Sequence, residues 1–413
     1  MRRVIVYLLA ASVVISCAYY RFVYYRQTDK NAIPVDEEIF NVSDFMLSGS
    51  YDYDGKQEQL PQDLKKQADS ISEKYKSVAV QVAVVENCEL KYTYEYGYAD
   101  TEKKLNVVPD TKFRIASLSK FVTDAVFMKL CEIGKAAINA DISDYLGYKV
   151  RNPYYPEKVI TPAMLVAHTS TIVNSEQFDY SLMNRSVTPI QEILSYDSAF
   201  CMAEPGNYYC YSNFAVAILG AICEKLTGIP FNNLAELYFF DPLDIDASYL
   251  AFELENRDLL ANIYAWEGLT VQEQLNVRSH QTIGQTHHLV QGNLTVSAKD
   301  YAKFIAMICA GGLTENGERL ISQESIDEML KSRIYSEGLG SGFGVEENKL
   351  LIKDRTLYSH TGNSYGLYST FTFDKESRDA VIIITSGTNA EYLDAYGMYD
   401  ICVELTKLFL PTE

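Results

Sequence analysis

The stretch Phe113–Lys120, FRIASLSK, is the part of the chain that best indicates its fold and chemistry. It places Ser117 and Lys120 three residues apart, at the predicted start of a helix that continues to Gly134. A serine hydroxyl becomes an effective nucleophile only when a neighbouring group removes its proton, and a lysine one helical turn further lies on the same face. Amides at a helix N-terminus also favour the negative charge that develops during attack. The stretch therefore indicates covalent serine catalysis of the S-x-x-K type.

An S-x-x-K spacing is weak alone, because a chain of this length contains about one by chance. A second motif, Tyr211-Ser212-Asn213, follows at the start of a predicted helix. A phenol can act as a general base if a nearby cation lowers its pKa, and Lys120 is predicted to supply that charge to Tyr211. The Asn213 amide can bind a substrate carbonyl or hold Lys120 in place.

A third motif, His360-Thr361-Gly362, precedes the predicted strand LYSTFTFD. Thr361 and Gly362 suit a strand edge that pairs with an extended substrate, because glycine permits close approach of another backbone. The order of the three motifs along the chain carries more information than any one of them.

With S-x-x-K, Y-x-N and H-T-G in this order, the chain resembles the penicillin-recognising serine hydrolases. The similar branch holds class C β-lactamases, serine D-Ala-D-Ala carboxypeptidases and related esterases. Longer stretches also resemble their counterparts there: GYADTEKKLNVVPDTKFRIASLSK, LVAHTS, PGNYYCYSNFAVAILGAICEKLTG, GNLTVSAKDYAKF and YSHTGNSYGLYS. The resemblance covers about residues 70–410 and implies a β-lactamase/transpeptidase-like fold.

The resemblance also implies a catalytic set. Ser117 would be the acylated nucleophile, and Lys120 and Tyr211 would share the abstraction and return of its proton. Asn213 would orient Lys120 and the substrate amide. His168 in LVAHTS is predicted to be a buried structural histidine rather than a base.

The substrate side of the site is implied in the same way. His360 and Thr361 would line the pocket and meet a substrate carboxylate, with Gly362 beside them. The oxyanion hole would be formed by the backbone amides of Ser117 and Asn363. No cofactor and no metal are implied.

Two departures from the family pattern lead to predictions. The third motif begins with His360 instead of lysine, and this form is more typical of peptidases and esterases than of efficient β-lactamases. Since an ordinary histidine is only partly charged at neutrality, binding of an anionic substrate is predicted to weaken as the pH rises from about 6 to 8. Thr171 stands where the family usually has glycine, and because threonine does not easily adopt positive φ, this loop is predicted to differ locally.

Composition narrows the function classes. The chain has 413 residues, 47% of them hydrophobic, which is ample for a large core. Its formal net charge of −19 argues against a nucleic-acid partner. The eight cysteines include no C-x-x-C and no cluster with histidine, so a structural zinc site is not expected. Cys201 and Cys210 are close enough in sequence to form a disulfide, and spacing leaves this open.

The N-terminus has the pattern of a targeting segment. Arg2 and Arg3 precede the apolar run VIVYLLAASVVIS, and Val14-Ile15-Ser16-Cys17 resembles the lipobox of bacterial lipoproteins. An uncleaved anchor helix is the alternative. Both interpretations predict an extracytoplasmic protein tethered to a membrane.

The expected architecture is α/β (α+β), with an antiparallel sheet built from both ends of the chain, flanked by helices, and an inserted, mostly helical part. The predicted divisions are a signal, lipoprotein or anchor segment at 1–26, an acidic linker at 27–60, and a hydrolase domain at 61–413. Within that domain, the α/β parts are expected at about 61–135 and 342–413, around a helical insertion at about 136–341. A last helix is predicted from about Leu393 to Leu410.

The leading functional prediction is a serine hydrolase acting through an acyl-enzyme on a small peptide, amide or ester. D-Ala-D-Ala carboxypeptidase-like and esterase-like activities are both included, with the peptidoglycan stem peptide as one candidate substrate. The alternatives are a penicillin-binding sensor without turnover and a class C-like β-lactamase. The sequence leaves the oligomeric state open.

Overall fold

A computed structural model describes residues 57–183, 188–265, 268–277, 282–285, 289–336 and 338–410. The predicted signal or anchor segment, with Cys17, and nearly all of the predicted linker lie outside the described residues.

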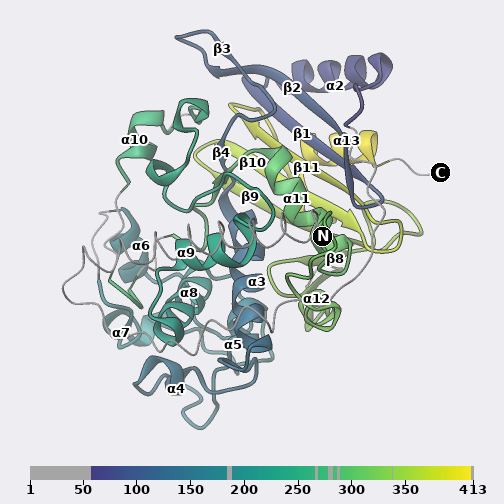
Figure 1. Cartoon of the computed structure of the whole chain (residues 1–413). Helices are drawn as coiled ribbons and strands as arrows, with labels where there is room; N and C mark the ends of the chain where they lie inside the picture. Colours follow the sequence, from purple (N-terminus) through teal and green to yellow (C-terminus); the bar gives the residue numbers. More distant parts are fainter. Residues whose placement is uncertain are drawn as a thin grey trace, which may run out of the picture. The chain divides into compact units, whose positions relative to one another are not determined.

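The described part is organised around a nine-stranded antiparallel sheet (Figure 1). The strand order is β3-β2-β1-β11-β10-β9-β8-β7-β6. The first three strands come from the N-terminal side of the domain and the other six from its C-terminal side, which confirms the predicted fold class. The strand bounds are β1 Ala79–Glu86, β2 Glu89–Asp100, β3 Leu105–Asn106, β6 Ile334–Ser336, β7 Leu339–Ser341, β8 Glu346–Asn348, β9 Leu357–Ser364, β10 Leu367–Asp374 and β11 Asp379–Ser386.

Two short strand pairs accompany the sheet. They are β4 (Phe113–Arg114) with β5 (Thr295–Val296), and β12 (Tyr392–Leu393) with β13 (Met398–Tyr399). The first pair matters for the site because β4 runs directly into the Ser117 turn.

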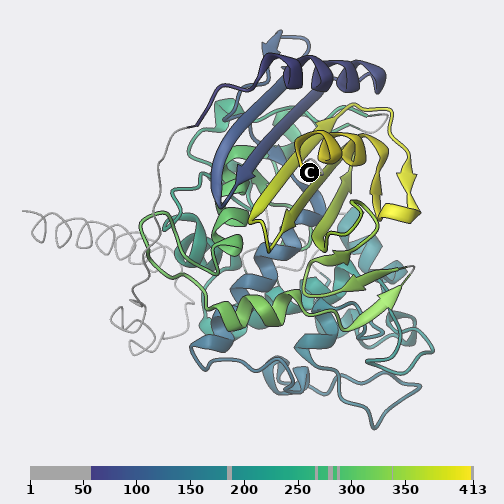
Figure 2. The same cartoon turned by 90° about the vertical axis from the view of Figure 1, so that its right-hand side faces the viewer.

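The helices are placed by the alternation of side chains along the strands. In β1, Ala79 and Ala83 face one hydrophobic core while Val80 and Val82 face another, so seven of its eight residues are buried. Helices α2 and α13 cover the face with Val80, and α11 covers the opposite face (Figures 1 and 2). The helix bounds are α2 Gln62–Lys74, α3 Ser119–Glu132, α4 Ile142–Leu146, α5 Pro162–Val166, α6 Glu176–Met183, α7 Ile190–Ile193, α8 Asn213–Thr227, α9 Phe231–Ala235, α10 Val271–Leu275, α11 Ala298–Cys309, α12 Gln323–Leu330 and α13 Asp400–Phe409.

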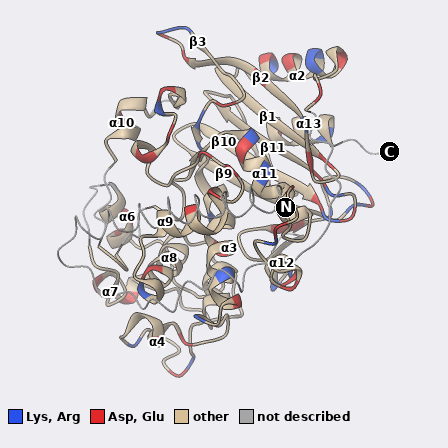
Figure 3. Ribbon diagram, in the orientation of Figure 1, with Lys and Arg blue, Asp and Glu red and all other residues tan. Residues whose placement is uncertain are grey.

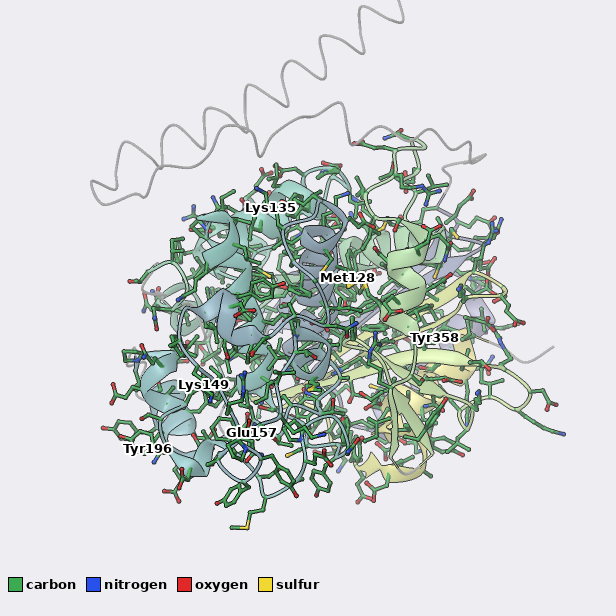
Figure 4. All side chains as sticks on the ribbon, turned by 90° about the horizontal axis from the view of Figure 1, so that it is seen from below. Met128, Lys135, Lys149, Glu157, Tyr196 and Tyr358 are labelled. Carbon is green, nitrogen blue, oxygen red and sulfur yellow. The ribbon has the colours of Figure 1, made fainter. Side chains whose placement is uncertain are left out.

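Helices α3 and α8 form the centre of the helical part, and nearly every residue of both is buried. Side chains fill the space between these helices and the sheet, as Figure 4 shows from below, with Met128 of α3 and Tyr358 of β9 labelled. The aromatic ring of Phe121 on α3 stacks on Phe371 of β10 at a centroid distance of 5.0 Å. This packing fixes the start of α3 against the sheet.

The C-terminal helix is shorter than the sequence predicted. Strands β12 and β13 and a 3₁₀ turn occupy residues 392–399, and α13 begins only at Asp400. Gly397 has φ of 64°, a left-handed conformation that ends the 3₁₀ turn and prevents one continuous helix. Strands β6 and β7 also precede position 342, where the sheet was expected to resume.

Residues of both charges are distributed over the described elements, as the blue and red segments of α2 illustrate in Figure 3. Within the described residues, no single helix has both the length and the apolar character needed to cross a membrane. One bent pair, α8 with Phe231–Phe240, passes that test by length and composition only.

Candidate active site

Ser117 lies in a 3₁₀ turn, Ala116–Leu118, between β4 and α3. The sequence placed it at the start of the helix; the structure places it just before α3, which begins at Ser119. Ala116 has φ of 51°, which is unusual for a residue with a Cβ and sets a sharp turn before Ser117. The Ser119 hydroxyl donates to the Ala116 carbonyl oxygen at 2.6 Å and supports this turn.

Lys120 brings its amine to the Ser117 hydroxyl, as the S-x-x-K spacing predicted. The Lys120 Nζ donates to Ser117 Oγ at 3.0 Å and to the backbone carbonyl of Gln291 at 2.6 Å. Burial lowers the pKa of Lys120 to about 7, although the carboxyl group of Asp124, one turn further along α3, acts in the opposite direction. A substantial fraction of Lys120 is therefore the neutral amine near pH 7 and can accept a proton.

Tyr211 contacts the same hydroxyl from the loop before α8. Its phenol donates to Ser117 Oγ at 2.9 Å, and the Lys120 Nζ lies 5.1 Å from the centre of its ring. The Ser212 side chain caps α8 by accepting from the amide of Ala215, which fixes the residue next to Tyr211.

The prediction that a nearby cation lowers the pKa of Tyr211, so that it can act as a general base, is wrong. Burial of the phenol, together with the negative charges of Glu346 and Asp124, raises its pKa above the ordinary value instead of lowering it. The Tyr211 side chain is still 37% exposed, so burial is partial, but its hydroxyl stays protonated at neutral pH. Tyr211 is therefore arranged as a proton donor to Ser117 Oγ.

The imidazole ring of His168 packs against the ring of Tyr211. His168 is buried, its Nδ1 accepts from the Ser212 amide at 3.3 Å, and its ring centroid lies 4.4 Å from that of Tyr211. Burial lowers the pKa of His168 well below its usual range, so the ring is neutral. This agrees with the predicted structural role.

Asn213 is the first residue of α8, partly buried beside Tyr211. Among the described residues, the hydrogen bonds of the Lys120 amine go to Ser117 and Gln291, and none goes to Asn213. The Gln291 carbonyl thus holds Lys120 in the way expected of the Asn213 amide. Gln291 could not be predicted from the sequence, because any residue at that position carries a backbone carbonyl.

Strand β9 brings the third motif to the same place. Strand β9 pairs with β8 only through residues 357–359. The edge of β9 from His360 to Asn363 therefore extends beyond β8. The two-residue turn Tyr365-Gly366, with φ of 53° and 81°, closes the hairpin with Ser364 opposite Leu367. In this register the amide of Asn363 points away from β10, toward the uncovered edge.

Gly362 is required by close packing against the Ser117 turn. A Cβ at this position would lie 2.6 Å from the carbonyl oxygen of Ile115 and 2.3 Å from the hydroxyl of Ser369. The absence of a side chain therefore lets β9 lie directly beside the nucleophile turn. The close approach of a substrate backbone at this glycine, which the sequence indicates, stays a prediction.

The protonation state of His360 also differs from the sequence-based prediction that it is partly charged at neutral pH. His360 is buried, and burial together with the charge of Lys120 lowers its pKa to about 4. Its Nδ1 lies 2.7 Å from the carbonyl oxygen of Thr361. The imidazole is therefore neutral throughout the range from pH 6 to 8, and the predicted loss of anion binding across that range has no basis in His360.

The sequence of the chain matches a known family. A sequence model named Beta-lactamase matches residues 64–399. The chain belongs to the Beta-lactamase family. This confirms the family resemblance inferred from the three motifs.

Among curated proteins, the chain is 28% identical over 174 residues to Protein flp of Staphylococcus aureus strain MRSA252, which covers 41% of this chain and 34% of that protein. It is 27% identical over 268 residues to the teichoic acid D-alanine hydrolase of Staphylococcus aureus, covering 61% of this chain and 62% of that protein. The chain therefore matches about a third of the first relative and less than two thirds of the second.

A solved structure shares the fold. The octameric penicillin-binding protein homologue from Pyrococcus abyssi superposes with a TM-score of 0.67 at 21% identity, covering 84% of this chain and 76% of that one. The β-lactamase/transpeptidase-like fold predicted from the motifs is thus confirmed.

The loop after His168 keeps a left-handed residue in this member of the Beta-lactamase family. Thr171 has φ of 65°, so the expectation that threonine would avoid this conformation is wrong. Thr171 is fully buried, and its hydroxyl accepts from the Asn152 amide at 2.8 Å, which offsets part of the conformational cost.

Cys201 and Cys210 are free thiols in the structure, so the disulfide that spacing left open is not formed. Across the described residues, no group of three or more His, Cys, Asp or Glu side chains is arranged to hold a metal ion.

Proposed function

We propose that this protein is a serine hydrolase that acts through an acyl-enzyme on small esters, amides or peptides. One observation carries the proposal: the Ser117 Oγ lies 3.0 Å from the Lys120 amine and 2.9 Å from the Tyr211 hydroxyl. A serine held between a proton acceptor and a proton donor is equipped for nucleophilic attack followed by protonation of a leaving group.

In the proposed acylation, Ser117 Oγ attacks the substrate carbonyl carbon while its proton passes to the neutral Lys120 amine. The carbonyl oxygen gains negative charge and accepts from the backbone amides of Ser117 and Asn363. As the tetrahedral intermediate collapses, Tyr211 gives its proton to the leaving oxygen or nitrogen and is reprotonated from Lys120. Water then attacks the acyl-enzyme with the same groups in the reverse roles, which releases the acid and restores Ser117.

The acyl group is proposed to be a D-alanyl or similar D-aminoacyl group. The support is the relative named teichoic acid D-alanine hydrolase and the neutral His360, which supplies no cation for a substrate carboxylate. The N-terminal pattern around Cys17 supports a location outside the cytoplasm, tethered to a membrane. The substrate would then be a component of the cell envelope.

The proposal is tested by adding a fluorescent fluorophosphonate and a chromogenic D-alanyl ester to the purified protein. We expect label on the wild type, none on Ser117→Ala, and ester turnover that depends on Ser117. Persistent label without turnover of the ester would instead favour a sensor that acylates and stalls. Hydrolysis of a chromogenic cephalosporin in preference to the ester would favour a β-lactamase.

A further inference from the structure

Glu346 is a carboxylate that strand pairing places beside the candidate active site. It is the first residue of β8 and lies opposite Ser359 on β9. Because side chains alternate along a strand, Glu346 shares a sheet face with Ser359 and with the candidate substrate-binding residue Thr361. His360 lies on the other face. A Cβ at Gly397 would lie 3.3 Å from the Glu346 Oε2, so the carboxylate lies beside the turn that connects β12 and β13.

The charge of Glu346 acts on the tyrosines of the site. Burial is the main cause of the raised pKa of Tyr209 and of Tyr211, and the charge of Glu346 adds to it at both phenols. The Tyr211 hydroxyl is hydrogen-bonded to Ser117 Oγ at 2.9 Å, so the charge of Glu346 acts on a direct partner of the nucleophile. A carboxylate attracts an organic ammonium group by its charge, and an aromatic ring can also bind such a group.

Glu346 has no counter-charge of its own. In the part of the chain that the structure describes, no hydrogen bond or ion pair engages its carboxylate, and burial without a compensating cation raises its pKa to about 7. The neighbouring Glu347 differs, because its carboxylate accepts from Ser332 and Tyr335 and pairs with Lys349. A partly buried carboxylate without a partner is costly unless a ligand supplies one.

The charges of His360 and Lys120 indicate whether a ligand beside Glu346 would be positively or negatively charged. His360 is neutral, and Lys120, with a pKa of about 7, is only partly charged. A carboxylate ligand would therefore be repelled by Glu346 with little compensation, whereas an ammonium group would be attracted and would favour the ionised form of Glu346.

We propose that Glu346 forms a subsite for the free ammonium group of an aminoacyl substrate, and so selects acyl donors that carry an unblocked amine. This rests on the proposed function and names the substrate class of the Ser117 site. Esters and amides of an amino acid through its carboxyl group have this chemistry, because their amine stays free and charged.

The test measures binding and does not require turnover. Labelling of Ser117 by a fluorescent fluorophosphonate is slowed by increasing D-alanine amide or N-acetyl-D-alanine amide, which differ in the charged amine. We expect the free amine to protect the wild type at least about tenfold more effectively than the acetylated compound. In Glu346→Gln this ratio is expected to fall to within about twofold of one.

Glu347→Gln is the matched control, since it removes the adjacent carboxylate that already has partners, and it should keep the wild-type ratio. Circular dichroism and the thermal unfolding midpoint of Glu346→Gln, compared with the wild type, report that its fold is intact, and the protection ratio is taken relative to the variant's own rate without competitor. An equal effect of both amides on the wild type overturns the ammonium subsite, as does a preference that survives in Glu346→Gln. If the wild type is not labelled at all, the proposed function itself is wrong and the subsite is rejected with it.

Discussion

The Lys120 Nζ lies 3.0 Å from the Ser117 Oγ, and burial brings the pKa of this amine to about 7. The two facts belong together, because a lysine in water would be fully protonated at neutral pH and unable to accept the serine proton. The Gln291 carbonyl, 2.6 Å from the same nitrogen, fixes the amine in this position. Lys120 is thus the base of the proposed mechanism, with Tyr211 as the proton donor.

This assignment predicts the pH dependence of acylation. Only the neutral amine accepts a proton, so kcat/KM for a neutral ester should rise with pH through an apparent pKa near 7 and level off above it. The measurement is a pH–rate profile between pH 5.5 and 9. Because Glu346 also titrates near 7, the profile is repeated with Glu346→Gln, which leaves Lys120 in place. A rate that is flat or falls across this range would contradict the role of Lys120.

Tyr211 should matter through its hydroxyl alone. Tyr211→Phe keeps the ring against His168 but removes the donor to Ser117 Oγ, so we expect kcat/KM for the same ester to fall by about 10²-fold or more. Tyr208→Phe is the matched control, since Tyr208 is 53% exposed nearby in the same loop. Equal effects of the two substitutions would remove Tyr211 from the mechanism.

Gly362 should be intolerant of even a methyl group. Gly362→Ala would push a Cβ into the Ile115 carbonyl and the Ser369 hydroxyl, which we expect to lower the free energy of unfolding by about 1–3 kcal/mol and to displace β9 from the Ser117 turn. Urea unfolding and the rate of fluorophosphonate labelling measure the two effects. Gly292→Ala is the control, because the nearest atoms to a Cβ there are 3.9 Å away. Unchanged stability and labelling in Gly362→Ala would show that β9 is not held as described.

His360 should remain neutral at physiological pH. With a folded-state pKa of about 4, its ring resonances, assigned by comparison with His360→Gln, should not shift between pH 6 and 8 in an NMR titration. The sign for stability follows from the lowered pKa. The unfolded state binds a proton from about pH 6.5 downward, so this contribution to stability is present above that pH and is lost as the pH falls toward 4. A His360 resonance that titrates near 6.5 would restore the pH-dependent anion binding expected from the sequence.

The sequence predicted those parts of the site that depend on spacing along the chain. Ser117, Lys120 and Tyr211 meet because one helical turn and one loop position are enough to define them. The packing of Gly362 against Ile115 and Ser369 was not predicted, since the sequence suggested only that a substrate backbone approaches there. Protonation states were not predictable, since they depend on burial. The same neighbourhood lowers the pKa of Lys120 and His360 and raises that of Tyr211.

Backbone features also escaped prediction. The Gln291 carbonyl has no residue-specific signature, and the left-handed conformation of Thr171 is stabilised by Asn152, a contact between residues far apart in the chain. The predicted C-terminal helix began too early in the chain. Residues 392–399 form the short strand pair β12–β13 instead, with a turn at Gly397 between the two strands.

The central claim, that Ser117 is the nucleophile, is tested most directly by mass spectrometry after reaction with a fluorophosphonate. Trypsin cleavage after Arg114 and Lys120 gives the peptide 115–120, in which fragment ions distinguish Ser117 from Ser119. The account predicts one adduct, on Ser117, that is lost in Ser117→Ala and strongly slowed when Lys120 is replaced by methionine. An adduct on another residue, or an equal yield of adduct from Ser117→Ala, would contradict it.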